Sequence, residues 1–240
     1  MDIIKKELFA HPRGNIVSQK KKALIIGATG ATGAQLLNLL LKSDNWDKIT
    51  TITRKPVLSG ENHKKLNKIV IDSFDNLDQT AESWVGHDSF FNCIGTTRKI
   101  AGGAKQFAAI EFGISLKCAE LASKAKIPNA SVISAGGANA NAWAVDWIHP
   151  LLYTKTIGMK EETLTKHFSF NNVSIFRPGM LIRKYNEDSR LQRFFDSTNL
   201  GLPVKTLAEA LKRDAEAISE NSTDSFTYLG NKCIKSSILT

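Results

Sequence analysis

The residues from Gly27 to Gly33 have the types and the spacing of a phosphate-binding turn. They read Gly-Ala-Thr-Gly-Ala-Thr-Gly, after an apolar run at 23–26 and before a second apolar run at 35–41. A strand, a tight glycine turn and a helix N-terminus leave backbone N–H groups unpaired, and the helix dipole favours negative charge there. The pattern therefore predicts a dinucleotide whose pyrophosphate rests on Gly27, Gly30 and Gly33, in preference to an ordinary strand–helix connection.

Two basic residues, Arg54 and Lys55, follow the next apolar run, 49–53. A site that prefers NAD has Asp or Glu at this distance from the glycines, where the carboxylate accepts a hydrogen bond from the ribose 2′-hydroxyl. A guanidinium instead pairs well with a 2′-phosphate. The sequence therefore favours NADPH, and the alternative is that the two cations simply begin a surface loop.

Polar residues also follow the third and fourth apolar runs. Asp72 could accept a hydrogen bond from an adenine amino group, or it could end the strand in an Asx turn. Gly95 lets the backbone pass close to a ligand, and the hydroxyls of Thr96 and Thr97 could bind ribose or phosphate. Helix capping by the threonines is the alternative.

Ser134 and Tyr153 are the candidate catalytic residues. Ser134 ends the apolar run 130–134, and Tyr153 begins the next segment with helical character. Such a pair can hold a substrate carbonyl while the tyrosine gives or takes the proton and a nicotinamide carries the hydride. The turn Arg177-Pro178-Gly179 would shape the nicotinamide end of the pocket, or it is turn chemistry alone.

Strands that alternate with helices are needed to position these residues. The pattern predicts strands at 23–27, 49–53, 68–71, 89–94, 130–134 and 173–176. It predicts helices at 33–42, 80–84, 105–125, 152–167, 191–195 and 206–220. This order is typical of an α/β fold, here a single doubly wound Rossmann domain with a mostly parallel sheet and helices on both faces. We expect a short helix and linker at 1–21, the Rossmann domain at 22–240, and a C-terminal extension from about Gly179.

Composition and charge exclude several classes of protein. The chain has 240 residues, 42% hydrophobic and 23% charged, with a net charge of +9. Its basic residues are spread along the chain, so nucleic-acid binding is not expected, whereas a basic balance suits a polyanionic cofactor. No apolar stretch approaches the roughly 18 residues that cross a bilayer.

The cysteine count and the first residues of the sequence indicate where in the cell the protein is expected. Cys93, Cys118 and Cys233 are odd in number and widely spaced, which argues against a disulfide framework and a zinc site. Cys93 lies in an apolar run and is expected to be a buried hydrophobe, with a reactive thiol as the alternative. The chain start has no secretory core, and its acidic residues oppose a mitochondrial presequence, so we expect a cytoplasmic location.

These motifs together resemble those of the atypical short-chain dehydrogenases/reductases, and most of all the Tat-interacting-protein type of oxidoreductase. The resemblance runs from about residue 22 to 234, and the run Gly95-Thr96-Thr97-Arg98 is its most specific part. It implies a Rossmann fold that binds NADPH, with Tyr153 as catalytic acid/base, and regulatory roles through protein partners. It also assigns the pyrophosphate to Thr29, Gly30, Ala31 and Thr32, the 2′-phosphate to Arg54 and Lys55, and the adenosine side to Ile94 and Gly95.

The chain departs from the family motif Tyr-x-x-x-Lys, because Ile157 stands where the lysine belongs. The motif lysine shares a helix face with the tyrosine, lowers its pKa and reaches the nicotinamide ribose. Lys155 faces another side of the helix, and Lys160 lies roughly 10 Å further along the axis than Tyr153. The sequence therefore predicts NADPH binding with slow carbonyl reduction, and the alternative is a catalytically degenerate regulatory or scaffold protein.

The segment between Ser134 and Tyr153 is longer than the family's connection. It contains Trp143 and Trp147, which are four residues apart and would share one face of a helical turn. Such a turn could form a lid for an apolar substrate, or the tryptophans could pack on the core or on a partner chain.

Overall fold

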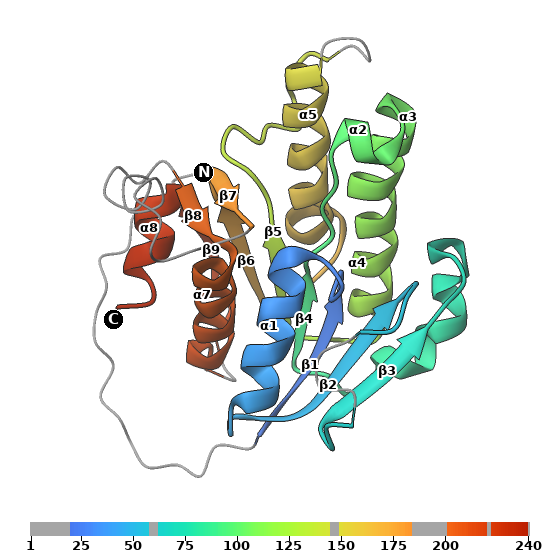
Figure 1. Ribbon diagram of the computed structural model, residues 1–240, viewed down its shortest axis with the longest axis vertical. Coiled ribbons are helices and arrows are strands. Elements are labelled where there is room, and N and C mark those ends of the chain that lie inside the picture. The colour runs from blue at the N-terminus through green and yellow to red at the C-terminus, as the bar shows by residue number, and fades with distance from the viewer. Residues whose placement is uncertain (1–19, 58–61, 145–148, 184–200, 220–221, 240) are drawn as a thin grey trace.

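The computed structural model describes residues 20–57, 62–144, 149–183, 201–219 and 222–239. Its centre is a seven-stranded parallel sheet in the order β3-β2-β1-β4-β5-β6-β9 (Figure 1). The strands are β1 (Lys21–Ile26), β2 (Trp46–Thr53), β3 (Leu66–Val70), β4 (Ser89–Asn92), β5 (Asn129–Ile133), β6 (Asn172–Arg177) and β9 (Ser225–Leu229). A separate pair of short parallel strands is formed by β7 (Met180–Ile182) and β8 (Gly201–Pro203).

Strand β1 is an inner strand of the sheet, and its sequence can be buried on both faces. Its residues Ala23, Leu24, Ile25 and Ile26 are all completely buried, as a continuous apolar run in a parallel sheet must be. It pairs with β2 on one side and with β4 on the other. The strand order reverses at this point, so the carboxyl ends of β1 and β4 form the crevice where doubly wound sheets bind their ligands.

Helices cover both faces of the sheet (Figure 1). The α-helices are α1 (Ala31–Lys42), α2 (Arg98–Ala101), α3 (Ala104–Ala108), α4 (Ile114–Lys124), α5 (His149–Glu162), α7 (Val204–Ala217) and α8 (Gly230–Ser236). The other helical segments are the 3₁₀-helix η1 (Phe74–Trp84) and the π-helical turns η2 (Ala109–Gly113) and η3 (Thr163–His167). One apolar cluster lies under α1 and α7, and the other under η1, α4 and η3.

The predicted fold class is confirmed, and all six predicted strands are present. The predicted helix 105–125 is interrupted, because α3 passes through the π turn η2 before α4 begins. A π turn inserts a residue into the helical repeat, and such turns are frequent at functional sites. Here it contains the buried carboxylate of Glu111.

Strand β9 was not predicted. It pairs with β6 at the edge of the sheet, and four of its five residues are exposed, so it lacks the continuous apolar run that marks the inner strands. The three-residue strands β7 and β8 are too short to give a pattern. The predicted helix 191–195, and almost all of the predicted helix and linker 1–21, lie outside the described residues.

Candidate functional site

The turn after β1 is built so that two of its glycines cannot carry a side chain. Gly27 has a left-handed φ of +85°, and a Cβ on it would lie 2.6 Å from the carbonyl carbon and oxygen of Cys93. A Cβ on Gly33 would lie 2.2 Å from the carbonyl oxygen of Gly27. These glycines are required by the close packing of the turn against the end of β4, and of α1 against the turn.

The middle glycine is different, because little of the protein surrounds it. A Cβ on Gly30 would meet only the Gly27 carbonyl oxygen, at 3.2 Å, and Gly30 is exposed together with Thr29 and Ala31. Gly30 is also the N-cap residue of α1, and its position provides no side-chain acceptor for the first helical N–H groups. Open space beside uncapped backbone donors at a helix N-terminus is what a pyrophosphate needs, so the turn fits a dinucleotide. Thr32, by contrast, is buried.

Arg54 and Lys55 are exposed directly after β2. The Arg54 guanidinium carbon lies 5.4 Å from the ring centroid of Phe74, a cation–π distance that holds the side chain near the end of β3. Asp72, which follows β3, is exposed, and the neighbouring Ser73 makes the cap of η1 by accepting a hydrogen bond from the Asp75 N–H at 3.1 Å. Three charged side chains are therefore grouped at the carboxyl ends of β2 and β3.

The loop after β4 continues this edge of the sheet. Ile94 is buried, Gly95 is exposed and Thr96 is half-buried. The Thr97 hydroxyl accepts a hydrogen bond from the Ile100 N–H at 3.2 Å and so caps α2, as the capping interpretation expects. The Thr96 N–H donates to Glu111 Oε1 at 2.6 Å.

A buried ion pair lies behind this loop. Lys160 and Glu111 are 1% and 2% exposed, and Lys160 Nζ lies 3.2 Å from Glu111 Oε2. Lys160 Nζ also donates to the carbonyl oxygen of Ile94 at 2.5 Å. The pair therefore joins α5 and η2 to the backbone of the loop.

Tyr153 lies in the first half of α5, with its ring stacked on that of Phe107 at a centroid distance of 5.8 Å. Burial raises the pKa of the Tyr153 hydroxyl above its ordinary value, and the negative charge of Glu111 raises it further. The side chain is therefore held in its protonated form at neutral pH.

The residue one turn after Tyr153 is apolar and buried, since Ile157 is only 3% exposed. Tyr153, Ile157 and Lys160 have the i, i+4, i+7 spacing of one helix face. The lysine on this face, Lys160, is hydrogen-bonded to the Ile94 carbonyl oxygen and to Glu111. Lys155 lies half-exposed elsewhere on α5.

Ser134 belongs to a second network, in which Ser134 and Glu161 are buried and Arg177 is half-buried. Arg177 donates to Glu161 from Nε at 2.8 Å and from Nη2 at 2.5 Å, and the Ser134 hydroxyl is hydrogen-bonded to Glu161 Oε1. A carboxylate paired with a guanidinium accepts hydrogen bonds and does not donate them, so the Ser134 proton is committed to Glu161. Glu161 stands eight residues after Tyr153, about 12 Å further along the helix axis.

The long segment after Ser134 begins by crossing α5. The Asn139 N–H donates to the Thr154 carbonyl oxygen at 3.0 Å, and a Cβ on Gly158 would lie 2.1 Å from the Ala140 nitrogen. Trp143 is 68% exposed, outside any helix, whereas Trp147 lies outside the described residues. The start of the segment is therefore fixed to the helix that carries Tyr153.

Sequence reasoning missed several residues of this edge. Phe107, Glu111 and Glu161 were not singled out, and Lys160 was considered only as a replacement for the motif lysine. Charged residues in helical segments ordinarily lie on the solvent face, so their pattern gives no local sign of burial. The one available sign was that Lys160 shares a helix face with Tyr153 and Ile157.

Cys93 is a buried residue, as the sequence predicts. Cys93 and Cys118 are buried and unpaired, and Cys233 is exposed. Burial raises the pKa of the Cys93 thiol to about 12, so it is not a reactive thiolate. The described residues contain no cluster of His, Cys, Asp or Glu that could hold a metal ion. None of the described helices has the length and apolar character of a membrane span.

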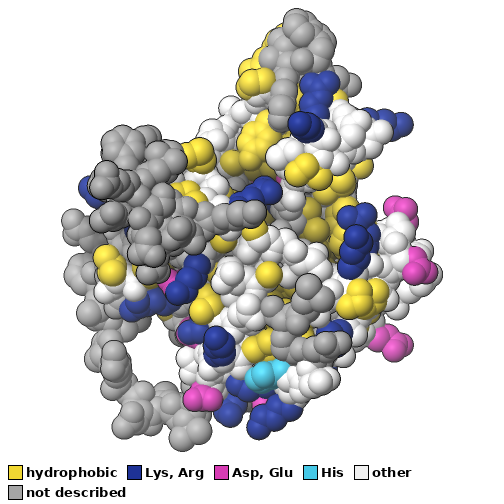
Figure 2. Space-filling view, viewed as in Figure 1, with side chains coloured by type: hydrophobic (Ala, Val, Ile, Leu, Met, Phe, Trp, Pro, Cys, Tyr) yellow, Lys and Arg dark blue, Asp and Glu magenta, His cyan; other side chains and the backbone are white. Residues whose placement is uncertain are grey.

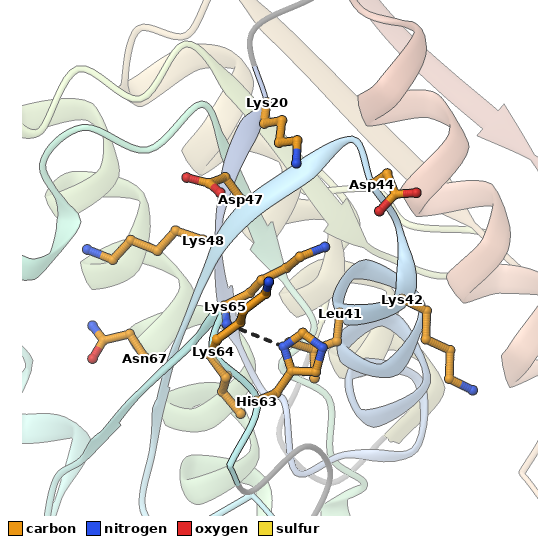
Figure 3. Close-up of a pocket in the computed structure, with 11 residues that line it drawn as sticks. Lys20, Leu41, Lys42, Asp44, Asp47, Lys48, His63, Lys64, Lys65 and Asn67 are labelled. Carbon is orange, nitrogen blue, oxygen red and sulfur yellow. Dashed lines mark hydrogen bonds between the residues drawn. The ribbon is translucent and has the colours of Figure 1, made fainter.

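A basic hollow of about 790 Å³ lies at the opposite end of the sheet (Figure 3). It is lined by the end of α1 and the beginnings of β2 and β3, and includes Lys42, Lys48, His63, Lys64 and Lys65. Figure 2 shows Lys, Arg and His side chains gathered at this end of the molecule. Because Rossmann sheets bind cofactors beyond the carboxyl ends of their strands, the hollow is separate from the candidate site.

Comparison with known proteins identifies the family of the chain. A family model described as NAD(P)H-binding matches residues 27–218. HTATIP2 of Rattus norvegicus is 31% identical over 217 residues, which cover 86% of each chain. The mitochondrial protein FMP52 of Debaryomyces hansenii is 34% identical over 163 residues, covering 68% of this chain and 67% of that protein.

Solved structures show the same fold at lower sequence similarity. The oxidoreductase YlbE of Lactococcus lactis superposes with a TM-score of 0.61 at 18% identity, over 91% of this chain and 96% of that one. The matched family binds a nicotinamide cofactor, and the match begins at the first glycine of the turn. The chain therefore belongs to the NAD(P)H-binding family, as an atypical short-chain dehydrogenase/reductase resembling HTATIP2.

Proposed function

We propose that this member of the family is an NADPH-dependent reductase that acts slowly on a small carbonyl compound. The observation that carries the proposal is the place of Tyr153 on α5, with its ring stacked on Phe107. Its hydroxyl is protonated at neutral pH, and burial raises its pKa further above that range. A protonated phenol can donate to a carbonyl oxygen that is being reduced, but it cannot accept the proton of an alcohol. When bound, the cofactor supplies the hydride.

The preference for NADPH is proposed from the charges after β2 and β3. Arg54 is held over Phe74 and would pair with the 2′-phosphate, together with Lys55. Asp72 would accept from the adenine amino group. The remaining cofactor contacts are assigned to the backbone of the glycine turn and of the loop after β4, namely Gly27, Thr29, Gly30, Ala31, Thr32, Gly33, Ile94, Gly95 and Thr96.

Slow turnover is proposed because neither catalytic side chain is activated. With Ile157 in place of the motif lysine, less than about one tyrosine in a thousand is ionised at pH 7. Ser134 would bind the substrate carbonyl only as a donor, and its proton is already bonded to Glu161. Substrate binding through Ser134 therefore requires that this hydrogen bond is exchanged.

The test combines binding with turnover. Purified protein is titrated with NADPH and NADH, with thermal shift and fluorescence as readouts, and then screened for NADPH consumption with aldehydes, ketones and quinones. We expect tighter binding of NADPH and a turnover far below the median enzyme value of about 10 s⁻¹. Tyr153→Phe should abolish turnover and leave NADPH affinity within about twofold. Wild-type turnover near the median value would contradict slow catalysis, and stabilisation by neither cofactor would contradict the binding assignment.

A second candidate function is a cofactor-binding regulator without catalysis. It is favoured by Ile157 and by the commitment of Ser134 to Glu161, which together leave a cofactor site next to an unactivated tyrosine. In that case NADPH would bind normally, no carbonyl compound would be reduced, and protein partners would distinguish the NADPH-bound state from the free state. A pull-down with and without NADPH separates the two candidates.

A cytoplasmic location belongs to the proposal as well. Its support is the cysteine content, because three widely spaced cysteines, all of them free, suit a reducing compartment. Relatives such as FMP52 carry the description mitochondrial, so fractionation of cells that produce the full chain with a C-terminal tag decides the point. Recovery in the mitochondrial fraction would overturn it.

A further inference from the structure

Lys160 is a charged side chain with no part in the proposed chemistry, although it lies in the interior. Its exposure is 1%, and its ammonium group binds two acceptors, the Ile94 carbonyl oxygen and Glu111 Oε2. The pKa of Tyr153 is raised, by burial and by Glu111, whereas the motif lysine would lower it. Lys160 therefore does not take over the task of the missing motif lysine.

Glu111 extends the same contact to a second point of the loop. One of its carboxylate oxygens pairs with Lys160, and the other accepts the Thr96 N–H at 2.6 Å. The carboxylate reaches both partners from the π turn η2, which interrupts the helix at this position. Two backbone groups of the loop, the Ile94 carbonyl and the Thr96 amide, are thus fixed by one ion pair.

The loop that is held in this way forms one wall of the glycine turn. The backbone of Cys93 and Ile94 approaches Gly27 so closely that a Cβ on Gly27 would lie 2.6 to 2.9 Å from it. A movement of the loop would therefore displace the surface against which the turn packs. The ion pair and the glycine turn thus contact the same short stretch of backbone, residues 93–96.

Packing alone does not explain why charged residues occupy this place. Cys93 and Cys118 near Lys160 are both buried, and burial raises the pKa values of both thiols while the Lys160 charge opposes the increase. In such surroundings an apolar pair of similar volume often stabilises a protein as well or better. What an apolar pair could not supply is a donor for the Ile94 carbonyl and an acceptor for the Thr96 amide.

We infer that Lys160 and Glu111 are positioning residues for the nicotinamide cofactor, which act by fixing the backbone of residues 94–96 beside the glycine turn. In this role the two side chains need no contact with the cofactor, since the pair sets the geometry of a loop that binds it. The inference rests on the proposed binding of the cofactor at this edge of the sheet. It assigns Lys160 a role in cofactor binding and none in proton transfer.

Amide hydrogen exchange of the cofactor-free protein tests the positioning step by itself. The readout is the protection of the peptide that contains residues 94–97 in wild type, Lys160→Met and the double variant Glu111→Met/Lys160→Met. The double variant leaves no unpaired charge, and it serves if the single variant does not fold. Exchange in this peptide should become at least tenfold faster in both variants, while peptides from α7 keep their rates.

NADPH titration tests the consequence for the cofactor. We expect the dissociation constant to rise at least tenfold in both variants. Lys212→Met is the matched control, because it removes a lysine from another helical ion pair, Lys212–Glu216 on α7, and its NADPH affinity and its loop exchange should match the wild type.

The outcomes separate the inference from the proposed function. Unchanged exchange at 94–97, or faster exchange with an NADPH affinity within twofold of wild type, overturns the positioning role. If the wild-type protein binds neither NADPH nor NADH, cofactor binding fails, and the positioning role for it fails too. The exchange data then still show whether the ion pair holds the loop, so the two failures are distinguishable.

Discussion

The glycine turn and helix α5 both contact the loop after β4, but they tolerate change very differently. The turn is made of backbone, and Gly27 and Gly33 leave no room for any side chain. Helix α5 contributes side chains instead. Four residues after Tyr153, where the family motif has lysine, it carries the buried Ile157. The proposed binding half of the site, the glycine turn, is fixed by its packing, whereas in the proposed catalytic half, helix α5, Ile157 takes the place of the motif lysine and Lys160 and Glu161 form buried ion pairs.

The difference follows from how each part performs its task. A pyrophosphate is held by N–H groups whose positions depend on the whole path of the chain, so a single substitution there disturbs the fold. Proton transfer depends on a few side-chain atoms, which can be exchanged without moving the backbone. We therefore expect the affinity of this chain for the cofactor to be less impaired than its rate of turnover.

The largest effect is expected from Gly33→Ala. Its new methyl group would meet the Gly27 carbonyl oxygen at 2.2 Å, and such overpacking costs about 1–3 kcal/mol or more of unfolding free energy. Gly30→Ala should cost less than about 1 kcal/mol, yet weaken NADPH at least tenfold because the methyl occupies the open space. Thermal unfolding and titration separate the two; equal stability losses would contradict the division between packing and binding glycines.

The catalytic half should respond to Ile157→Lys. A lysine one turn from Tyr153 lowers the pKa of the tyrosine hydroxyl, which increases the fraction of phenolate at a given pH. We expect alcohol oxidation with NADP⁺ to increase by about 10- to 100-fold, with some loss of thermal stability from burying the charge. Ile157→Met is the control of similar size and should leave the rate unchanged. No increase in well-folded Ile157→Lys would show that more than the lysine is missing.

Charge on the binding half is tested by Arg54→Gln. Loss of the guanidinium should raise the NADPH dissociation constant about tenfold, equivalent to about 1.4 kcal/mol, and leave that of NADH unchanged. Lys55→Gln should have a smaller effect, because Lys55 lacks the contact with Phe74 that places Arg54. A parallel loss of affinity for both cofactors would place Arg54 away from the 2′-phosphate.

The smallest expected effect is the response of carbonyl reduction to pH. Because the Tyr153 pKa is raised, its hydroxyl stays protonated across this range. The rate of reduction should therefore change less than about twofold between pH 7 and 9. Stability contributed by the raised pKa is fully present below about pH 10 and is lost only as pH rises through the folded value. Alcohol oxidation should instead increase with pH throughout this range, because the phenolate fraction grows. A reduction rate that falls steeply above pH 8 would indicate a lowered tyrosine pKa.

The fold could be predicted because its signals are local. The buried run at β1 and the glycines after it stand within a few residues of one another, and both follow from constraints on a single strand and a single turn. Lys160 and Glu111 are 49 residues apart, and each reads locally as a surface residue of a helix. Their meeting depends on the π turn η2 and on the packing of α5, neither of which leaves a periodic trace.

The edge strand β9 could not be predicted for a related reason. Its exposed residues do not form the apolar run of an inner strand, and only pairing with β6 makes it part of the sheet. Tyr228 shows the tertiary contacts that support it, since its ring stacks on Phe176 at 4.5 Å and its hydroxyl donates to Asp214 at 2.6 Å.

Lys21, at the start of the first strand, contacts the end of α7, more than 190 residues further along the chain. Its ammonium group donates to the carbonyl oxygens of Ala215, Glu216 and Ile218 at the end of α7, at 2.7, 3.4 and 2.9 Å. Helix α7 also covers the apolar face of α1. During synthesis on the ribosome, the glycine turn therefore emerges long before α7. Until α7 has been made, the apolar face of α1, the helix that follows the turn, stays uncovered. A nascent chain that ends before α7 should bind NADPH no better than an unfolded one, which arrest of translation at defined lengths can measure.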